Sequence, residues 1–353
     1  MRFQLTDDQR ALRRGTRELF EARFDRAALR RAVDHGGLDR TLWRTLGEAG
    51  LFALRLPEAD GGVGLGLPEA VLAFEEAGRV LLPGPLVATH LAAGEIPGAA
   101  TGETVVTAAY GGLVEWLEEA DVVRGLEEAD VVRGLEEADV VRGLEEADVV
   151  RELDAADLVR ELDAADAVRG LDAADAVRGA GAVAGPVPLE SVDPLTPLHR
   201  STPPARAVPA GPADPVVVLL TAAEQLGGAA RTCELAVQHA RAREQFGRPI
   251  GAFQAVKHLC AEMLVRVETA RAAVYAAAVT ADPLDAAAAR LLADDAAVRG
   301  ARDCLQVHGG MGFTWDSEVH LHLKRAWVRT RRTGDVTHSE ELLAGNLLSA
   351  TAP

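Results

Sequence analysis

The sequence predicts a mainly α-helical protein with a helical domain at each end and an unusual region between them. Helix-forming runs with capping signals occupy both ends of the chain, and a strictly periodic acidic repeat occupies residues 117–178. The 353 residues, 48% hydrophobic and 26% charged, can bury one large core or two to three smaller ones. We therefore expect an N-terminal helical domain over residues 1–100, an atypical middle region over 101–212 and a C-terminal helical domain over 213–353.

Capping and turn signals define the N-terminal helices. Residues 6–9, Thr-Asp-Asp-Gln, form a capping-box pattern, and apolar or small residues then recur at helical spacing up to Phe24. A second helix is predicted near residues 42–50, followed by a glycine-rich turn at 56–65 and a further helix from Pro68 to Gly78. Proline at the start of a helix and glycine at its end match the usual asymmetry.

The repeat dominates the middle region. Seven near-copies of Leu-[Glu/Asp]-[Glu/Ala]-Ala-Asp-x-Val begin at Leu117 with a period of nine, and their 20 acidic residues and 7 arginines supply −13 of the net charge of −17. One continuous helix would place successive leucines on opposite faces and have no single apolar stripe. A turn of helix or loop followed by a short Val-Val strand, punctuated by glycine, fits each unit equally well. We expect a structural or spacer segment, with a partner-binding surface as the alternative.

Long helices also fill the C-terminal part. From Val216 to Ala278 the helix formers are interrupted by Arg-Glu-Gln-Phe-Gly-Arg-Pro-Ile-Gly-Ala-Phe-Gln at residues 243–254. Proline and glycine there end one helix, and Phe253-Gln254 open the next. A third helix is predicted from Pro283 to Val307, and it runs into Gln-Val-His-Gly-Gly-Met-Gly-Phe at residues 306–313.

This order of helices and turns resembles the acyl-CoA dehydrogenase family. The Pro-Glu-x-x-Gly-Gly-x-Gly turn at residues 57–64 and Glu-Glu-x-Gly-Arg at 75–79 match its N-terminal domain. The interruptions at 243–254 and 306–313 match the two flavin-nucleotide motifs of its C-terminal four-helix bundle. The resemblance implies α,β-dehydrogenation of an acyl-CoA thioester, with FAD as hydride acceptor and a further electron-transfer acceptor.

The resemblance also implies a set of FAD contacts. A pyrophosphate is held by a permanent cation and by backbone N–H groups that no side chain obstructs. Arg243 supplies the cation, and the paired glycines after residue 308 leave the backbone open. In the family both segments reach the AMP half of an FAD that is bound mainly by a neighbouring subunit. The expected contacts are Arg243, Gln245, Phe246, Gln254, Gln306, Gly309 and Gly310.

The catalytic base of the family is not found at its usual positions. Most members carry a glutamate just before a glycine that lies 24 residues after the second glycine of Gln-x-x-Gly-Gly, and here Thr333 precedes that glycine, Gly334. Other members place the base 26 residues before the motif arginine, which is Val217 here. Neither side chain can accept an α-proton. The nearest acids are Glu224, two helical turns beyond Val217, and Asp335. Glu224 is equally a candidate for a structural or subunit contact.

The middle β domain of the family is also reduced. Only residues 102–110 and 183–208 look strand-like, and the loops that touch the flavin ring are not recognisable. The repeat stands in their place. We expect the chain to complete a nucleotide site more securely than it holds a flavin ring.

Composition excludes several classes of function. The net charge of −17 would repel a phosphate backbone, which argues against a nucleic-acid partner. No segment has the roughly 18 consecutive apolar residues of a membrane span, and the first residues are too polar for a secretory signal, so we expect a cytoplasmic protein. Cys233, Cys260 and Cys304 lack metal-ligand spacing and are expected to be buried, reduced thiols, and no metal site is predicted.

Three hypotheses remain open at this point. The chain is one subunit of a hetero-oligomeric acyl-CoA dehydrogenase, of the kind that degrades steroids and unusual acyl chains in actinobacteria, with a split active site. Alternatively it is a self-sufficient homo-oligomer with Glu224 or Asp335 as base. The third hypothesis is a non-catalytic scaffold whose acidic repeat binds a partner.

Overall fold

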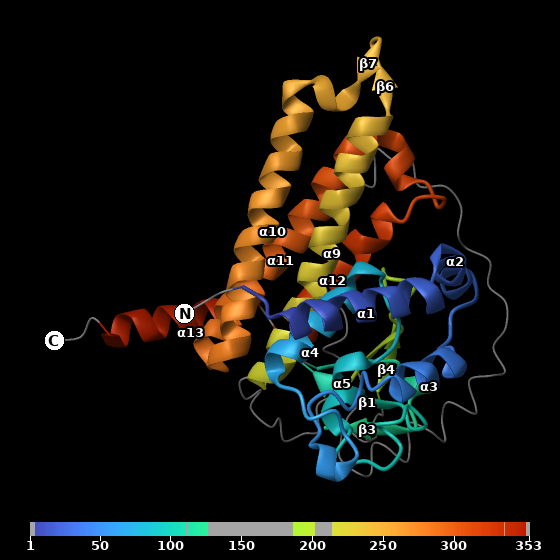
Figure 1. Cartoon of the computed structure of the whole chain (residues 1–353), viewed down its shortest axis with the longest axis vertical. Helices are drawn as coiled ribbons and strands as arrows, with labels where there is room; N and C mark the ends of the chain where they lie inside the picture. The colour runs from blue at the N-terminus through green and yellow to red at the C-terminus, as the bar shows by residue number, and fades with distance from the viewer. Residues whose placement is uncertain (1–3, 111, 126–185, 202–213, 335, 351–353) are drawn as a thin grey trace, which may run out of the picture.

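The structure is a computed structural model that describes residues 4–110, 112–125, 186–201, 214–334 and 336–350. A bundle of long helices forms one part of the molecule, and the N-terminal helices and a small sheet pack around one end of it (Figure 1). This arrangement confirms a mainly helical fold with helical parts at both ends, and the described residues between them form a small sheet.

The N-terminal part consists of five α-helices and a short 3₁₀ turn. The capping box predicted at residues 6–9 is present, because the Thr6 hydroxyl accepts from the Gln9 backbone N–H and the Gln9 side chain accepts from Thr6 N–H. The elements are α1 (Asp7–Arg23), α2 (Arg26–His35), α3 (Arg40–Glu48), η1 (Glu58–Asp60), α4 (Leu67–Arg79) and α5 (Leu86–Ala92). Helices α1, α3 and α4 match the prediction, whereas α2 and α5 were not predicted.

The described sheet has five short strands in the order β3-β1-β2-β5-β4. Strand β3 runs parallel to β1, and the other neighbours are antiparallel. The strands are β1 (Val106–Tyr110), β2 (Leu113–Glu115), β3 (Val122–Arg124), β4 (Val187–Leu189) and β5 (Leu198–Arg200). Strand β1 lies in one of the two segments predicted to be strand-like, and β4 and β5 lie in the other.

The first copy of the repeat is part of this sheet. Its Leu-Glu-Glu forms a 3₁₀ turn, η2 (Leu117–Glu119), its Val-Val-Arg forms β3, and Gly125 ends the unit at φ +81°. The Asp121 carboxylate accepts from the Val105 N–H at 2.7 Å and pairs with Arg40 at 2.6 Å. For this copy the turn-plus-strand interpretation is correct. The other copies lie outside the described residues.

The C-terminal part is a bundle of long helices that end in caps and hairpins. Asp214 caps the first long helix and Asp282 caps the third, each followed by proline at the first helical position. The elements are α9 (Pro215–Ala242), β6 (Glu244–Gln245), β7 (Arg248–Pro249), η3 (Ile250–Ala252), α10 (Gln254–Thr280), α11 (Pro283–His308), η4 (Gly309–Phe313), α12 (Val319–Arg332) and α13 (Val336–Ala350). Helices α9 to α12 pack against one another, while α13 extends sideways (Figure 1).

One hydrophobic core joins the N-terminal helices to the bundle. It contains Phe20 and Phe74 from the first part and Leu220 and Met263 from the second. Helices α4 and α9 approach closely. A Cβ on Gly227 would lie 1.9 Å from the Glu75 carbonyl oxygen, and one on Gly78 would lie 2.0 Å from the Glu224 carbonyl oxygen. Only glycine permits so close a crossing, so Gly78 and Gly227 together determine how α4 packs against α9.

Candidate functional site

The first predicted nucleotide motif forms an exposed hairpin at one end of the bundle. Strands β6 and β7 project beyond α9 (Figure 1), and Arg243, Gln245 and Phe246 are exposed there. The Phe246 side chain is 91% exposed. Its ring meets Phe253 edge to face, with ring centroids 6.0 Å apart. An aromatic ring in this setting is available to a ligand or to another chain.

The second motif lies at the same end of the bundle. Gln306 is exposed on the last turn of α11, and Gly309 caps that helix at φ +60°. A Cβ added at Gly309 or Gly310 would meet nothing within 4 Å, so the backbone there is open. The two motifs are neighbours, because His239 near the end of α9 stacks on His308 at the end of α11, with ring centroids 4.1 Å apart. The residues at this end therefore fit the charged, extended part of a dinucleotide.

The two positions where the family carries its base are both buried here, and neither holds an acidic side chain. Val217 is 2% exposed on α9, and Thr333 is 4% exposed at the end of α12. The Thr333 hydroxyl has no hydrogen-bond partner among the described residues. Asp335, one of the two alternative bases, lies outside the described residues.

Glu224, the other alternative base, is the centre of a buried ion-pair network. It is fully buried and accepts from Arg329 Nη2 at 2.8 Å and from Arg332 Nη1. Arg332 in turn donates to both carboxylate oxygens of Glu115 on β2, at 2.8 and 2.7 Å. Burial opposes ionisation of Glu224, yet the two arginines outweigh it and lower the pKa of the carboxyl below its ordinary value. Glu224 is thus a paired carboxylate with both oxygens engaged.

A small cavity lies beside this network. The cavity beside Arg332 and Glu115, between α5 and the sheet, has a volume of about 10 Å³. Its wall also includes Pro85, Val87 and Tyr110. Such a volume holds about one water molecule, so this cavity cannot hold a flavin ring or an acyl chain.

Sequence reasoning did not find Arg332, Arg329 or Glu115 as members of this cluster. The signal was present, because three arginines occupy the last turn of α12 directly before the neutral Thr333. An arginine-rich turn that leads into a buried segment requires buried counter-charges. The identity of those counter-charges depends on contacts between α9, α12 and β2, which lie more than 100 residues apart in sequence for each ion pair.

The remaining predictions concern thiols, metals and membranes. Cys233 and Cys304 are buried free thiols as expected, whereas Cys260 is only half-buried because it sits on the partly open face of α10. The described residues contain no cluster of three or more side chains suited to a metal ion. None of the described helices is long and apolar enough to cross a membrane.

Two family models together match more than half of the chain. Residues 6–104 match the acyl-CoA dehydrogenase N-terminal domain, and residues 219–335 match the acyl-CoA dehydrogenase C-terminal domain. The acyl-CoA dehydrogenase IpdE2 of Mycobacterium tuberculosis is 34% identical over 335 residues, an alignment that covers 91% of each chain.

Solved structures with the same fold include heteromeric enzymes. A chain of the ChsE4–ChsE5 complex from Mycobacterium tuberculosis matches with a TM-score of 0.71 and 23% identity, covering 100% of both chains. A chain of the Tcur3481–Tcur3483 steroid acyl-CoA dehydrogenase matches with a TM-score of 0.70 and 23% identity, covering 98% of this chain and 99% of that one. The full-length similarity to IpdE2 and the two domain matches together show that this chain is a member of the acyl-CoA dehydrogenase family of enzymes.

Proposed function

We propose that this chain is one subunit of a hetero-oligomeric acyl-CoA dehydrogenase and supplies the nucleotide half of a split FAD site. The observation that carries the proposal is the buried network of Glu224, Arg329, Arg332 and Glu115. It lies beside Thr333, where the family carries its base, and leaves a cavity of only about 10 Å³. In this proposal the flavin ring and the acyl chain bind in space that a second chain provides.

The chain's own part in the site is to bind and orient the cofactor. FAD, when bound, supplies the acceptor for the β-hydride of the acyl-CoA thioester. In the proposal, Arg243 would place a permanent positive charge against the pyrophosphate, and the backbone at Gly309 and Gly310, which carries no side chains, would let the pyrophosphate approach closely. Phe246, on the exposed hairpin, covers the nucleotide from the side of this subunit.

Comparisons with known proteins support the heteromeric assembly and a substrate class. The two solved complexes with this fold each pair two different proteins, and one of them is described as a steroid acyl-CoA dehydrogenase. We propose a bulky acyl-CoA of this kind as substrate, and a homologous acyl-CoA dehydrogenase subunit as partner. The proposed partner carries a glutamate or aspartate at one of the two base positions that Thr333 and Val217 occupy here.

Flavin absorbance tests the assembly directly. The chain is purified alone and after co-expression with a homologous subunit from the same genome, and absorbance near the flavin band is measured. The proposal expects flavin only in the co-expressed complex. A yellow, active chain on its own would instead establish the self-sufficient enzyme with an internal base. A colourless complex would support the non-catalytic scaffold.

The role of Glu224 is tested separately by Glu224→Gln. Because this change leaves Arg329 and Arg332 without their shared buried carboxylate, we expect a loss of about 3–5 kcal/mol in the free energy of unfolding. Turnover per folded complex should keep the parent pH profile. Unchanged stability together with abolished turnover would make Glu224 the base. Asp335→Asn tests the other alternative by the same pair of measurements.

A further inference from the structure

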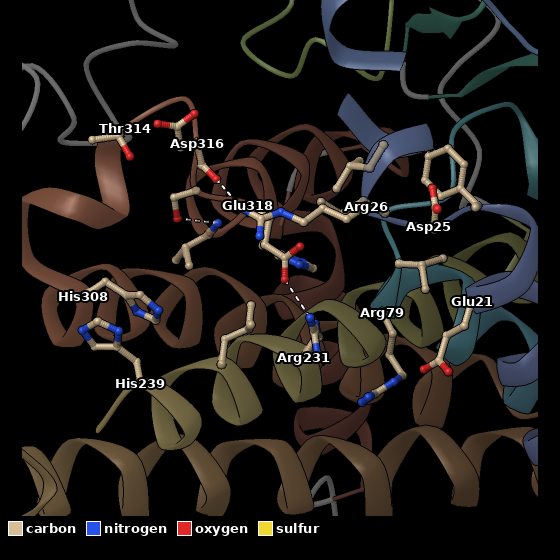
Figure 2. Close-up of a pocket in the computed structure, with 18 of the residues that line it drawn as sticks. Glu21, Asp25, Arg26, Arg79, Arg231, His239, His308, Thr314, Asp316 and Glu318 are labelled. Carbon is tan, nitrogen blue, oxygen red and sulfur yellow. Dashed lines mark hydrogen bonds and ion pairs between the residues drawn. The ribbon is translucent and has the colours of Figure 1, made fainter. Parts of the chain in front are cut away.

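Two histidine rings stack where the helices that carry the two predicted nucleotide motifs end. His239 lies on the last turn of α9 and His308 is the last residue of α11. Their rings are inclined by 24°, with centroids 4.1 Å apart. Figure 2 shows the pair on the wall of a cavity of about 660 Å³ between the N-terminal helices and the bundle. Both rings are half-buried, and neither histidine is among the seven expected FAD contacts.

Each histidine is attached to a residue that is expected to contact FAD. The N–H of Arg243 donates to the carbonyl oxygen of His239 at 2.8 Å, which is the last hydrogen bond of α9. His308 directly precedes Gly309, whose φ of +60° turns the chain away from α11. The position of Arg243 relative to the open glycine backbone therefore depends on how the ends of α9 and α11 are held together.

The ring contact joins the two motifs directly. In the described part of the chain, the hydrogen bonds of residues 239–254 stay within α9, the hairpin and α10, and those of residues 305–313 stay within residues 301–314. His308 is also fixed by its own helix, because its Nδ1 donates to the Cys304 carbonyl oxygen at 2.8 Å. A carbonyl oxygen only accepts, so Nδ1 carries the proton.

We propose that His239 and His308 are a positioning pair, whose stacked, uncharged rings hold Arg243 beside the Gly309–Gly310 backbone in the arrangement that FAD requires. This inference rests on the proposed function, because it concerns how the proposed nucleotide half-site is assembled. Neither ring contacts the cofactor. Each acts through the residue of the motif to which its backbone is attached.

A positive charge on His239 opposes the stack. Protonation would place an imidazolium against the second ring and near the guanidinium of Arg243. Burial lowers the pKa of His239, and His308 and Arg243 add to this effect. The uncharged ring is therefore favoured at neutral pH, and acidification weakens the contact between the ends of the two helices.

Other ionisable groups share the cavity wall with the stack. Arg231 on α9 is paired with Glu318 at 2.7 Å (Figure 2), and Arg26 on α2 donates to the Asp316 carbonyl oxygen at 2.7 Å. His322 on α12 is buried, and burial lowers its pKa well below 6.5. On α1, on α4 and at the start of α2 the wall carries Arg17, Glu21, Asp25, Glu76 and Arg79. Carboxylates and guanidinium groups of ordinary pKa do not titrate between pH 7.5 and 5.5, which leaves histidine rings as the groups that change charge there.

Hydrogen–deuterium exchange of the purified chain tests the positioning without FAD. His239→Ala removes one ring and should make exchange in residues 305–313, on the other helix, roughly 2- to 10-fold faster, the effect of one aromatic stack. His239→Phe keeps a planar ring and should restore the parent rate. Gln238→Ala changes an exposed neighbour on α9 that does not line the cavity, and should leave this exchange unchanged. Parent-like exchange of residues 305–313 in His239→Ala would overturn the proposal.

Titration of the co-expressed apo complex with FAD tests the consequence for the cofactor. At pH 7.5 His239→Ala should weaken FAD binding by roughly 2- to 10-fold, and His239→Phe should bind like the parent. From pH 7.5 to 5.5 the parent should lose about 2-fold or more in affinity, because the free site takes up a proton that binding must release, and His239→Phe should lose less.

Two outcomes of the titration would overturn the positioning pair. The first is parent-like FAD affinity in His239→Ala. The second is a parent affinity that rises on acidification, which would mean that an imidazolium pairs with the phosphates. A parent complex that binds no FAD would instead refute the proposed function, and the exchange experiment alone would then decide whether the stack holds the two motifs together.

Discussion

At the scale of single residues, the proposed nucleotide site depends on one cation and two glycines. Arg243 is exposed directly after α9, and the backbone at Gly309 and Gly310 is unobstructed. Together they offer a positive charge and a backbone that no side chain obstructs, which favours the approach of a pyrophosphate.

Arg243→Ala and Gly310→Asp should each weaken FAD retention by the complex. The first removes a charge-assisted contact and the second places a carboxylate beside the pyrophosphate, and each should cost about 1.5–3 kcal/mol, or roughly 10- to 100-fold in affinity. Equilibrium titration of the apo complex with FAD measures the effect. Arg248→Ala is the matched control, because Arg248 lies on the same hairpin, over the Phe253 ring, and is not an expected contact. Full FAD affinity in both test variants would refute the assignment.

At the scale of elements, the crossing of α4 and α9 determines how the N-terminal part meets the bundle. Gly227 packs against the Glu75 carbonyl oxygen with no space for a side chain. Gly228, one residue later, has its nearest neighbour at 3.7 Å from a built Cβ. The two glycines are adjacent in the same helix, and only the tertiary contact distinguishes them.

Gly227→Ala should therefore destabilise the protein while Gly228→Ala should not. A methyl group at Gly227 must push α4 away, at a cost of about 3 kcal/mol or more. At Gly228 the methyl group meets ordinary van der Waals contacts, and the better helix propensity of alanine should stabilise the fold by up to about 1 kcal/mol. Urea unfolding of the two variants measures both effects. Equal stability of the two would mean that the helices do not cross at Gly227.

The repeat is the other feature at this scale. Only its first copy is described, and that copy is part of the sheet through β3 and Asp121. Deleting residues 135–143, which are identical in sequence to residues 126–134, should leave flavin content and assembly intact, because we expect no site in the repeat and a change in the length of a connecting segment costs little.

Asp121→Ala provides the contrast for the deletion. It leaves the Val105 N–H without its carboxylate and removes the partner of Arg40, so it should lower the free energy of unfolding by about 1–2 kcal/mol. Denaturation and size-exclusion chromatography measure both variants. Loss of solubility or of the complex on deletion would show that the number of copies is structural.

At the scale of the whole molecule, buried histidines set the response of stability to pH. Burial lowers the pKa of His90 and His320 to about 4, with Arg55 adding to the effect at His90 and Lys324 at His320. Burial also lowers the pKa of His322 well below 6.5. Between about pH 6.5 and 4 the unfolded chain takes up protons at these rings and the folded chain does not. Stability is therefore complete above pH 6.5 and falls as the solution is acidified.

Asp294 acts in the opposite direction. Burial raises the pKa of its carboxyl to about 6, despite the hydrogen bond from Gln225. The folded chain thus keeps this proton between about pH 4 and 6 while the unfolded chain loses it, so this one group adds stability on acidification. The lowered pKa values of three histidines act against the raised pKa of one aspartate, so the histidines determine the direction of the response.

Urea unfolding at pH 7, 6 and 5 should show a decreasing free energy of unfolding, and Asp294→Asn should make the decrease steeper. The substitution removes the only one of these four groups that opposes acid unfolding. A free energy that is constant or rises towards pH 5 would contradict the assignment of His90, His320 and His322 as buried neutral rings.

The sequence by itself determined most of the helices at both ends, the Thr6 capping box, two segments that contain strands, and the interruptions at residues 243–254 and 306–313. These features depend on local signals, such as the Thr6 capping box, Asp-Pro at residues 214–215 and 282–283, and the glycines that end helices. Such signals act over a few residues, so they can be recognised without knowing what packs against them.

Only the tertiary structure decided the roles of the charged residues in the interior. Glu224 fits a base or a structural acid equally well in the sequence. Its ion pairs with Arg329 and Arg332, and the ion pair of Arg332 with Glu115, depend on how α9, α12 and β2 pack. The same packing distinguishes Gly227 from Gly228 and creates the cavity beside His322. A charged side chain is buried at an acceptable cost only where another side chain supplies the opposite charge. Here that side chain comes from a segment distant in sequence, so the residues around the charge do not identify it.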